Sequence, residues 1–544
     1  MNAPGAYAAP KSLLTIKSLL ADRALTVERP RQQPPSLIFR LPAEMLAEMF
    51  MHATATAEVQ NASESDLRMP LPMYFHFVLS HVCALWRVVA LHTPSLWCRV
   101  VLHLRNRVTG FGNLTLLAKT CFERSCELPL ALIITSSIAA SSRIPNLSMD
   151  LVLPVRHRIR HLELQLPAVF TESIFKLPRN SLKVLESINI CALIDSHDAA
   201  LWAAEDNAMV RGPWFRSMSG LEGAPLLKSV KFSCMHPTGV LVAWRGQGFR
   251  PLGFDPYVAG LPWGQLTELA LRDLEIRCDD AVYALEMATN LLHCSLDLET
   301  LPPLEPVLVF TNAPPTDSDP LPLKIKKPMT VPALLVLELA VSGSGTVATD
   351  FFDRLILPSL TELSIKYKDT QTLPCATLTK LQERSSFSLE RFVLTSRTGD
   401  SLLPFFQSSP RICRLQLVFC GLELAPLVAA LTRTAGGNTL LPRLRILTLV
   451  DSWAEETPRT AWVCATKAVV EMARSRWRVQ AGSANPRLAA FTFGSGATLS
   501  EKKSARIHRL QAEGMRVRAV ISLPQRESLA RNDNINMILQ LDES

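Results

Sequence analysis

The sequence lacks the motifs that mark most enzyme classes and membrane proteins. No apolar run approaches the roughly 18 residues that a membrane-spanning helix needs, so no such helix is predicted. There is no Gly-x-Ser-x-Gly, no Gly-x-x-x-x-Gly-Lys, no Gly-x-Gly-x-x-Gly after a strand and no His-Glu-x-x-His. These absences leave no nucleophile, phosphate loop or zinc-protease helix to assign, so we predict no catalytic residue and no cofactor.

Metal-binding patterns are missing as well. The 12 cysteines are scattered, without a Cys-x-x-Cys pair. Sparse cysteines in a long chain are typical of small apolar core residues in a reducing compartment, which favours the cytoplasm or nucleus. His157 and His161 are four residues apart, but His161 leads into an expected strand and no carboxylate follows at a suitable spacing. We predict no metal site.

Charge is sparse for the size of the chain. Only 19% of the 544 residues are charged and 48% are hydrophobic, which indicates a folded protein with several domains or a repeat array. A net charge of +8 is a mild bias, so nucleic acid is not an expected partner. Basic side chains gather only after residue 465, around Trp477. We interpret them as a solvated helix face, with an acidic or nucleic-acid partner as the alternative: Arg474, Arg476, Arg478, Arg487, Lys502, Lys503, Arg506 and Arg509.

The densest apolar segment is 41–99. Pro42 marks a helix start, and an apolar stripe follows at helical spacing: Met45, Leu46, Met49 and Phe50. A second stripe over 78–89 predicts one further helix, which ends before Pro94. The polar segment 52–77 is expected to connect the two. Helices this short must bury their stripes on a partner or on the chain's own next domain.

The residues of this segment resemble a known family. Leu-Pro-x-Glu-Met-Leu-x-x-Met-Phe, Val-Cys-x-x-Trp-Arg-x-x-Ala and Thr-Pro-x-Leu-Trp follow one another over 41–97, as in the F-box-like class common in fungal proteins. The resemblance implies a three-helix unit that docks on the Skp adaptor of a cullin–RING ubiquitin ligase, although the connector is longer than in a compact F-box. It assigns these adaptor-binding residues: Leu41, Pro42, Leu46, Met49, Phe50, Val82, Cys83 and Trp86.

The rest of the chain repeats one pattern. Strands are expected at 99–104 and 129–134 with a helix at 115–125 between them, and a last strand at 516–523. Between these, segments with leucine at alternating positions follow helical stretches: 158–166, 181–190, 225–233, 264–274, 288–298, 331–341, 357–367, 388–396, 409–420, 441–451 and 486–494.

Such Leu-x-x-Leu-x-Leu units resemble irregular leucine-rich repeats, which implies an α/β solenoid whose strands share one core. The asparagine of the usual repeat is mostly absent, and unrelated α/β domains remain an alternative. Loop insertions are expected near 200–223 and 300–332.

The predicted fold class is thus α/β, with N-terminal all-α helices before a solenoid. The expected layout is a lead-in at 1–35, the F-box-like helices at 36–99, the solenoid at 100–520 and a polar tail at 521–544. The first functional hypothesis is a non-catalytic substrate receptor that joins the Skp adaptor and cullin–RING ligase to an unknown protein target. The alternative is a scaffold whose helix pair only caps the solenoid.

Overall fold

The protein is described by a computed structural model. It folds as two compact units, residues 1–137 with 150–161, and residues 138–149 with 162–544. The structure describes these residues: 37–63, 75–104, 111–136, 147–193, 218–235, 260–299, 327–343, 346–367, 374–395, 401–418, 424–434, 440–450, 459–478, 486–495 and 501–521. The expected lead-in at 1–35, the tail after 521 and Trp202 and Trp214 of the first expected loop lie outside the described residues.

The first unit begins with helices. A 3₁₀ turn, η1, precedes them, and a second, η3, follows and leads into the first strands. Their bounds are η1 Leu37–Arg40, α2 Ala43–Ser63, α3 Phe75–Val82, α4 Ala84–Leu91, η3 Pro94–Trp97, β1 Arg99–Leu104, α5 Phe111–Arg124 and β2 Leu130–Ser136. Buried and half-exposed residues alternate along β2, because every second side chain of a strand faces the core.

The strands form a parallel sheet of 14 strands, ordered as they occur in the sequence. Each expected leucine segment carries one of them, which confirms an α/β fold with a long parallel sheet. The strands after β2 are β3 Ile159–Pro167, β4 Ser187–Leu193, β5 Ser229–Met235, β6 Glu268–Ile276, β7 His293–Glu299, β9 Val336–Ser342, β11 Glu362–Tyr367, β12 Arg391–Thr395, β13 Arg414–Val418, β14 Ile446–Val450, β15 Ala490–Ser495 and β16 Arg516–Ile521.

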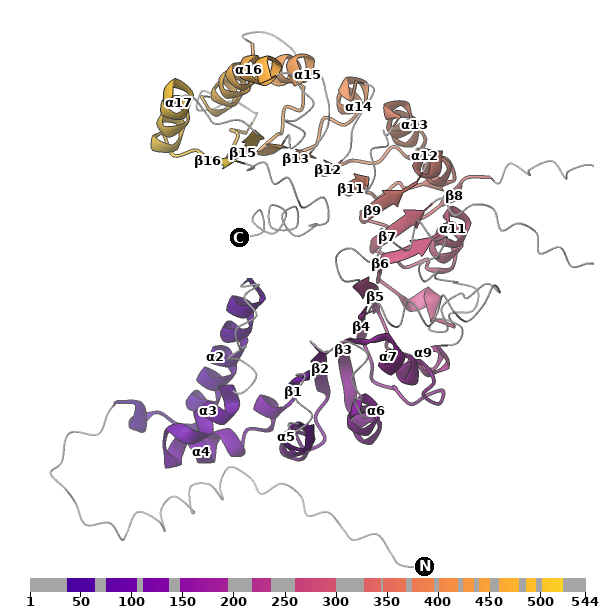
Figure 1. Ribbon diagram of the computed structural model, residues 1–544, viewed down its shortest axis with the longest axis vertical. Helices are drawn as coiled ribbons and strands as arrows, with labels where there is room; N and C mark the ends of the chain where they lie inside the picture. Colours follow the sequence, from indigo (N-terminus) through magenta and orange to yellow (C-terminus); the bar gives the residue numbers. More distant parts are fainter. Residues whose placement is uncertain are drawn as a thin grey trace, which may run out of the picture. The chain divides into compact units, whose positions relative to one another are not determined.

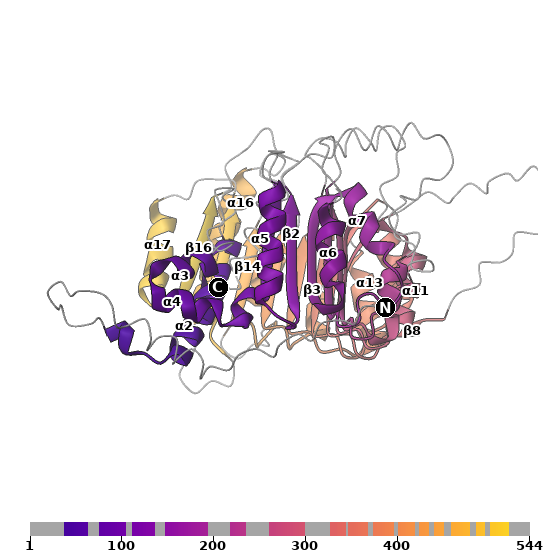
Figure 2. The same cartoon turned by 90° about the horizontal axis from the view of Figure 1, so that it is seen from below.

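Helices or 3₁₀ turns precede most of these strands. In the second unit the longer ones, α11 to α17, lie along one side of the strands (Figure 1, Figure 2). Their bounds, with those of α6 and η5 near the junction of the units, are α6 Leu147–Val152, η5 Leu153–Arg158, α7 Ala168–Phe175, α9 Ser219–Glu222, η7 Trp263–Gln265, α11 Cys278–Met287, α12 Thr346–Asp353, α13 Cys375–Ser385, α14 Leu403–Ser408, α15 Leu424–Leu431, α16 Arg459–Trp477 and α17 Glu501–Ala512.

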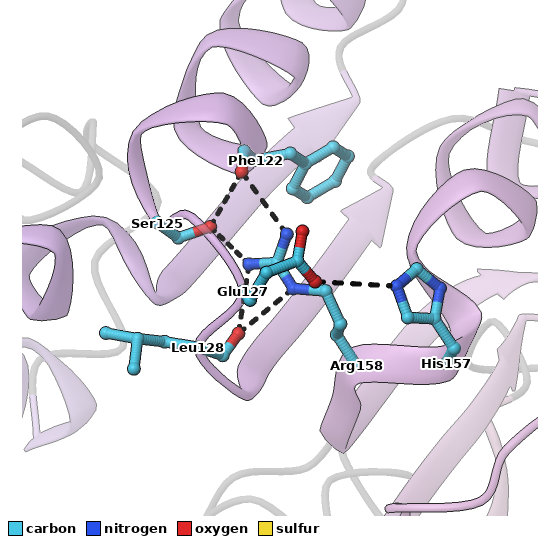
Figure 3. Close-up of polar contacts among 6 residues, drawn as sticks. All are labelled: Phe122, Ser125, Glu127, Leu128, His157 and Arg158. Carbon is cyan, nitrogen blue, oxygen red and sulfur yellow. Dashed lines mark hydrogen bonds and ion pairs between the residues drawn. The ribbon is translucent and has the colours of Figure 1, made fainter. Parts of the chain in front are cut away.

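Two arginine side chains donate hydrogen bonds between neighbouring elements. Arg158 donates to the carbonyl oxygens of Leu128 and Phe122 and to Ser125 Oγ, where α5 ends (Figure 3). Arg384 of α13 donates to Phe352 O at 2.6 Å, near the end of α12, and to Leu355 O at 3.0 Å. The last carbonyls of a helix have no backbone partner within it, so the guanidinium groups supply donors at the ends of α5 and α12, where Phe122 O also accepts from Ser125 Oγ.

The two expected loops lie mostly outside the described residues, and a short element occurs at the described end of each. Residues 219–222, at the end of the expected 200–223 loop, form α9. Residues 329–330, inside the expected 300–332 loop, form β8 Met329–Thr330, which pairs with β10 Leu355–Ile356 in a separate two-stranded sheet. The pairing partner of β8 is distant in sequence, so a short segment without alternation gave no signal for it.

Candidate functional site

Each residue of the expected adaptor-binding set lies in helix α2, α3 or α4 or directly before one of these helices. Pro42 precedes α2, and its carbonyl accepts the first helical hydrogen bond, from Leu46 N at 3.1 Å. The helix then continues to Ser63, so the expected connector at 52–77 is partly helical. Its sequence from Ala53 to Ser63 holds four alanines and neither glycine nor proline, which favours continuation.

The second expected helix is broken in two at Cys83. The backbone of Cys83 is extended (φ −157°, ψ 170°), and its Sγ accepts a hydrogen bond from Trp86 N at 3.4 Å, so it caps α4. Arg87 Nε donates to Ser80 O at 2.7 Å, which satisfies a carbonyl at the end of α3. The break divides this segment into α3 and α4, whereas the continuous apolar stripe had predicted one helix over 78–89.

The inner sides of these helices hold them together. Leu46 and Phe50 of α2 are buried, and the Phe50 ring lies 4.9 Å from the ring of half-buried Trp86 on α4. Val89 and Ala90 of α4 are buried as well. Three of the expected anchors, Leu46, Phe50 and Trp86, therefore form the packing between helices.

The outer sides expose apolar residues in pairs. Met45 and Met49 of α2 have exposed fractions of 53% and 47%, and Val78 and Val82 of α3 have 50% and 54%. Each pair is spaced i, i+4 and so lies on one side of its helix. Exposed large apolar residues of this kind mark contact surfaces when they gather. We call these four residues the exposed apolar pairs.

The expected anchors thus divide into three groups, of which the first, Leu46 and Phe50, is buried. Met49, Val82 and Pro42 are exposed, whereas Leu41 and Cys83 are half-buried like Trp86. Met45 and Val78 were missing from the expected set. Both stood in the stripes that predicted the helices, and their i, i+4 spacing from Met49 and Val82 was the available signal.

Trp97 connects the helices to the strand–helix segment that follows. It is fully buried, and its Nε1 donates to Ala90 O at 2.8 Å. The guanidinium of Arg124, from α5, lies 4.3 Å from the Trp97 ring centroid, and the ring of His76 packs edge-on at 4.6 Å. A cation over a tryptophan face is attractive, and more so when both are desolvated.

His76 also lies 3.8 Å from Cys121 Sγ. Burial, and then Arg124, lowers the pKa of His76 to about 4, and burial raises the pKa of Cys121 to about 11. Both groups are neutral at pH 7. A nucleophilic pair needs a thiolate beside an imidazolium, so this contact is packing and not a catalytic dyad.

The buried imidazole predicts a pH dependence of stability. In the unfolded chain His76 titrates near 6.5 and in the folded chain near 4. Between these pH values the unfolded state binds one more proton than the folded state. The free energy of unfolding therefore keeps its highest value above pH 6.5 and falls by roughly 3 kcal/mol as the pH drops to 4.

Thermal unfolding of the full chain between pH 7 and 4 measures this loss. The variant His76→Leu should flatten the dependence, and His81→Gln, at an exposed histidine of the same helix, should keep it. An unchanged pH dependence in His76→Leu would show that another group is responsible.

The two histidines that were considered as metal ligands lie in regular structural elements. His157 lies in η5, 4.0 Å from Glu127 of the residues before β2, and His161 lies in β3. No group of three or more histidine, cysteine or acidic residues that could hold a metal ion occurs within the described part of the chain. Over the same residues, no helix has the length and hydropathy needed to cross a membrane.

Several of the basic residues after 465 contact other groups of the chain. Arg476 is buried, and its guanidinium donates to Leu431 O at 2.6 Å, to Leu441 O at 3.0 Å and to Leu440 O. Arg478 pairs with Glu513, Arg474 lies 3.8 Å from Glu471, and Arg487 lies 5.9 Å from the Trp477 ring. Arg509 is exposed, and the side chains of Lys502, Lys503 and Arg506 lie outside the described residues.

Comparison with known proteins assigns no family. The chain matches no protein-family model and no curated protein.

Proposed function

We propose that the chain is a non-catalytic substrate receptor of an SCF-type (Skp–cullin–F-box) ubiquitin ligase. In this proposal α2, α3 and α4 form an F-box-like unit that docks on the Skp adaptor. The parallel sheet and its helices are a leucine-rich-repeat-like solenoid that presents a protein target to the ligase. The cytoplasm or nucleus is the expected location.

The observation that carries the proposal is the presence of the exposed apolar pairs. The inner residues Leu46 and Phe50 already satisfy the packing between helices, so Met45, Met49, Val78 and Val82 are not needed for it. Exposing four large apolar side chains in two helical pairs is costly in water unless a partner covers them. They lie within the segment whose sequence resembles the adaptor-binding family.

The sheet supports the second half of the proposal. Within the 14-stranded sheet the strands lie side by side in the order of the sequence, as β4 pairs in parallel with β5 and β13 with β14. Short units that stack in this way bury one continuous core and leave a long outer strand surface for a partner.

The scaffold alternative also has an observation in its favour. Trp97, with Arg124 and His76, packs the helices against α5, as expected for helices that cap a repeat array. The two functions differ in whether the exposed apolar pairs bind a partner.

The test is a pull-down with purified Skp adaptor. The full chain should bind, and a chain without residues 36–99 should not. Because that deletion also removes buried Trp97, a fourfold variant with Glu at 45, 49, 78 and 82 is the sharper comparison. Absence of binding by the full chain would favour the scaffold function.

A further inference from the structure

The strands β12, β13 and β14 are buried on both faces. On one face Phe392 packs its ring 5.1 Å from Phe405 of α14, and register places Leu415 and Leu447 beside it. The other face, which we call the Gln416 face, consists of the intervening residues Val393, Thr395, Gln416, Val418, Thr448 and Val450. These six have exposed fractions between 1% and 6%. In β5 and β11 the corresponding residues are half-exposed, apart from exposed Met235.

The described helices beside these strands do not account for this burial. Helices α13 to α16 lie on the Phe392 side (Figure 1). The Gln416 face therefore needs another occupant.

The chemistry of the face indicates what this occupant offers. A small open hollow lies where these strands begin, and it is lined by Arg391, Phe392, Val393, Arg414, Leu415, Gln416 and Ile446. Arg391 is 3.4 Å from Glu362, and Arg414 has no ion pair among the described residues. Gln416 Nε2 and Thr448 Oγ1 are buried and lack a hydrogen-bond partner within the described part of the chain. Buried polar atoms of this kind are nearly always paired, so a backbone or carboxylate group is expected here.

We propose that residues 535–543 of this chain bind the Gln416 face as an intramolecular ligand. Their sequence, Ile-Asn-Met-Ile-Leu-Gln-Leu-Asp-Glu, combines an apolar run with two acids. The apolar side chains match Val393, Val418 and Val450, and Asp542 and Glu543 match the arginine edge. An extended backbone supplies acceptors for Gln416 Nε2 and donors for Thr448 Oγ1.

The length of the chain permits this contact. Strand β16 ends at Ile521 and lies three strands from β13 in the sheet order, a separation of about 14 Å at roughly 4.8 Å per strand. Residues 522–534 span up to ~45 Å when extended. This inference does not depend on the ligase proposal.

The test uses a labelled synthetic peptide of residues 531–544 and fluorescence anisotropy. A chain that ends at residue 534 should bind the peptide, and the full chain should bind it on the order of 100-fold more weakly, because its own segment competes at a millimolar effective concentration. Arg414→Glu in the shortened chain should weaken binding at least tenfold. Arg443→Glu, at an exposed arginine of the turn before β14, is the matched control and should not.

A second variant keeps the chain at full length. Asp542→Lys with Glu543→Lys should release the segment and allow the labelled peptide to bind, without any deletion. Equal binding by the shortened and full chains, or equal effects of Arg414→Glu and Arg443→Glu, would overturn the proposal. Binding by a peptide of 301–326 in place of 531–544 would assign the face to a different segment and overturn it as well.

Discussion

Met49→Glu and Val82→Glu are each expected to weaken binding to the Skp adaptor by roughly 30-fold or more, the effect of losing a contact worth about 2 kcal/mol. Both side chains are about half exposed and lie on helices α2 and α3, so the folded chain accommodates a charge there. In the complex the same carboxylate is buried against apolar groups without a partner. Titration calorimetry with purified adaptor measures the loss.

The control is Leu116→Glu, which places the same charge at an apolar residue of α5 that is 65% exposed. It should bind the adaptor like the unaltered chain. Leu46→Asp should also abolish binding, but by unfolding the helices, since Leu46 is fully buried. Circular dichroism separates the two causes. Wild-type affinity in both Met49→Glu and Val82→Glu would falsify the assignment of this surface.

Arg476→Met is expected to destabilise the last repeats by roughly 3 to 5 kcal/mol. The side chain of Arg476 is 1% exposed, and its donors hold three carbonyl oxygens, among them that of Leu441. Leu441 has a positive φ of 50°, a strained conformation that this bond helps to hold. Removing the guanidinium takes one donor from Leu441 O, which still accepts from Leu444 N at 3.2 Å, and takes from Leu431 O and Leu440 O the side-chain donor described here. Burial lowers the pKa of Arg476 to about 10, so the group remains charged at pH 7.

Hydrogen exchange of the β14 and β15 amides reports the free energy of local opening for this variant. Arg474→Met is the matched control, because Arg474 lies two residues earlier on α16, is half exposed and pairs only loosely with Glu471. It should change the opening free energy by less than about 0.5 kcal/mol. Equal protection in the two variants would mean that the carbonyls near Leu431 and Leu441 find other donors.

The strands were predictable because their signal is local. A segment such as 357–367 alternates apolar with polar residues along its strand, and alternation alone assigns both its state and its buried side. The arginine contacts gave no such signal, since Arg158, Arg384 and Arg476 bind backbone carbonyls and no partner residue type appears in the sequence. Residue type did not predict the burial of Arg158 and Arg476 either, because most arginines in proteins are solvated.

The candidate site was predictable in outline only. Met45 and Leu46 are adjacent and equally apolar, yet one is exposed and the other buried. Successive residues point about 100° apart around a helix axis. Which of Met45 and Leu46 is buried therefore depends on the side on which α4 packs, and the periodicity of the sequence does not give that side. Cys83 interrupted a stripe that was apolar throughout, and its capping role depends on a backbone conformation that its residue type does not announce.

The sheet order carries a consequence for how the chain is made. Because each strand pairs with the strand that precedes it in sequence, nearly every strand–strand contact is complete once the next unit has been synthesised. Contacts between near neighbours in sequence form quickly, and domains assemble from their N-terminal part as a chain leaves the ribosome. At each stage the newest strand forms one edge of the growing sheet, opposite β1, and β16 forms that edge once the last strand is added. A pause in translation within the repeats would therefore leave that edge exposed to pairing with other chains.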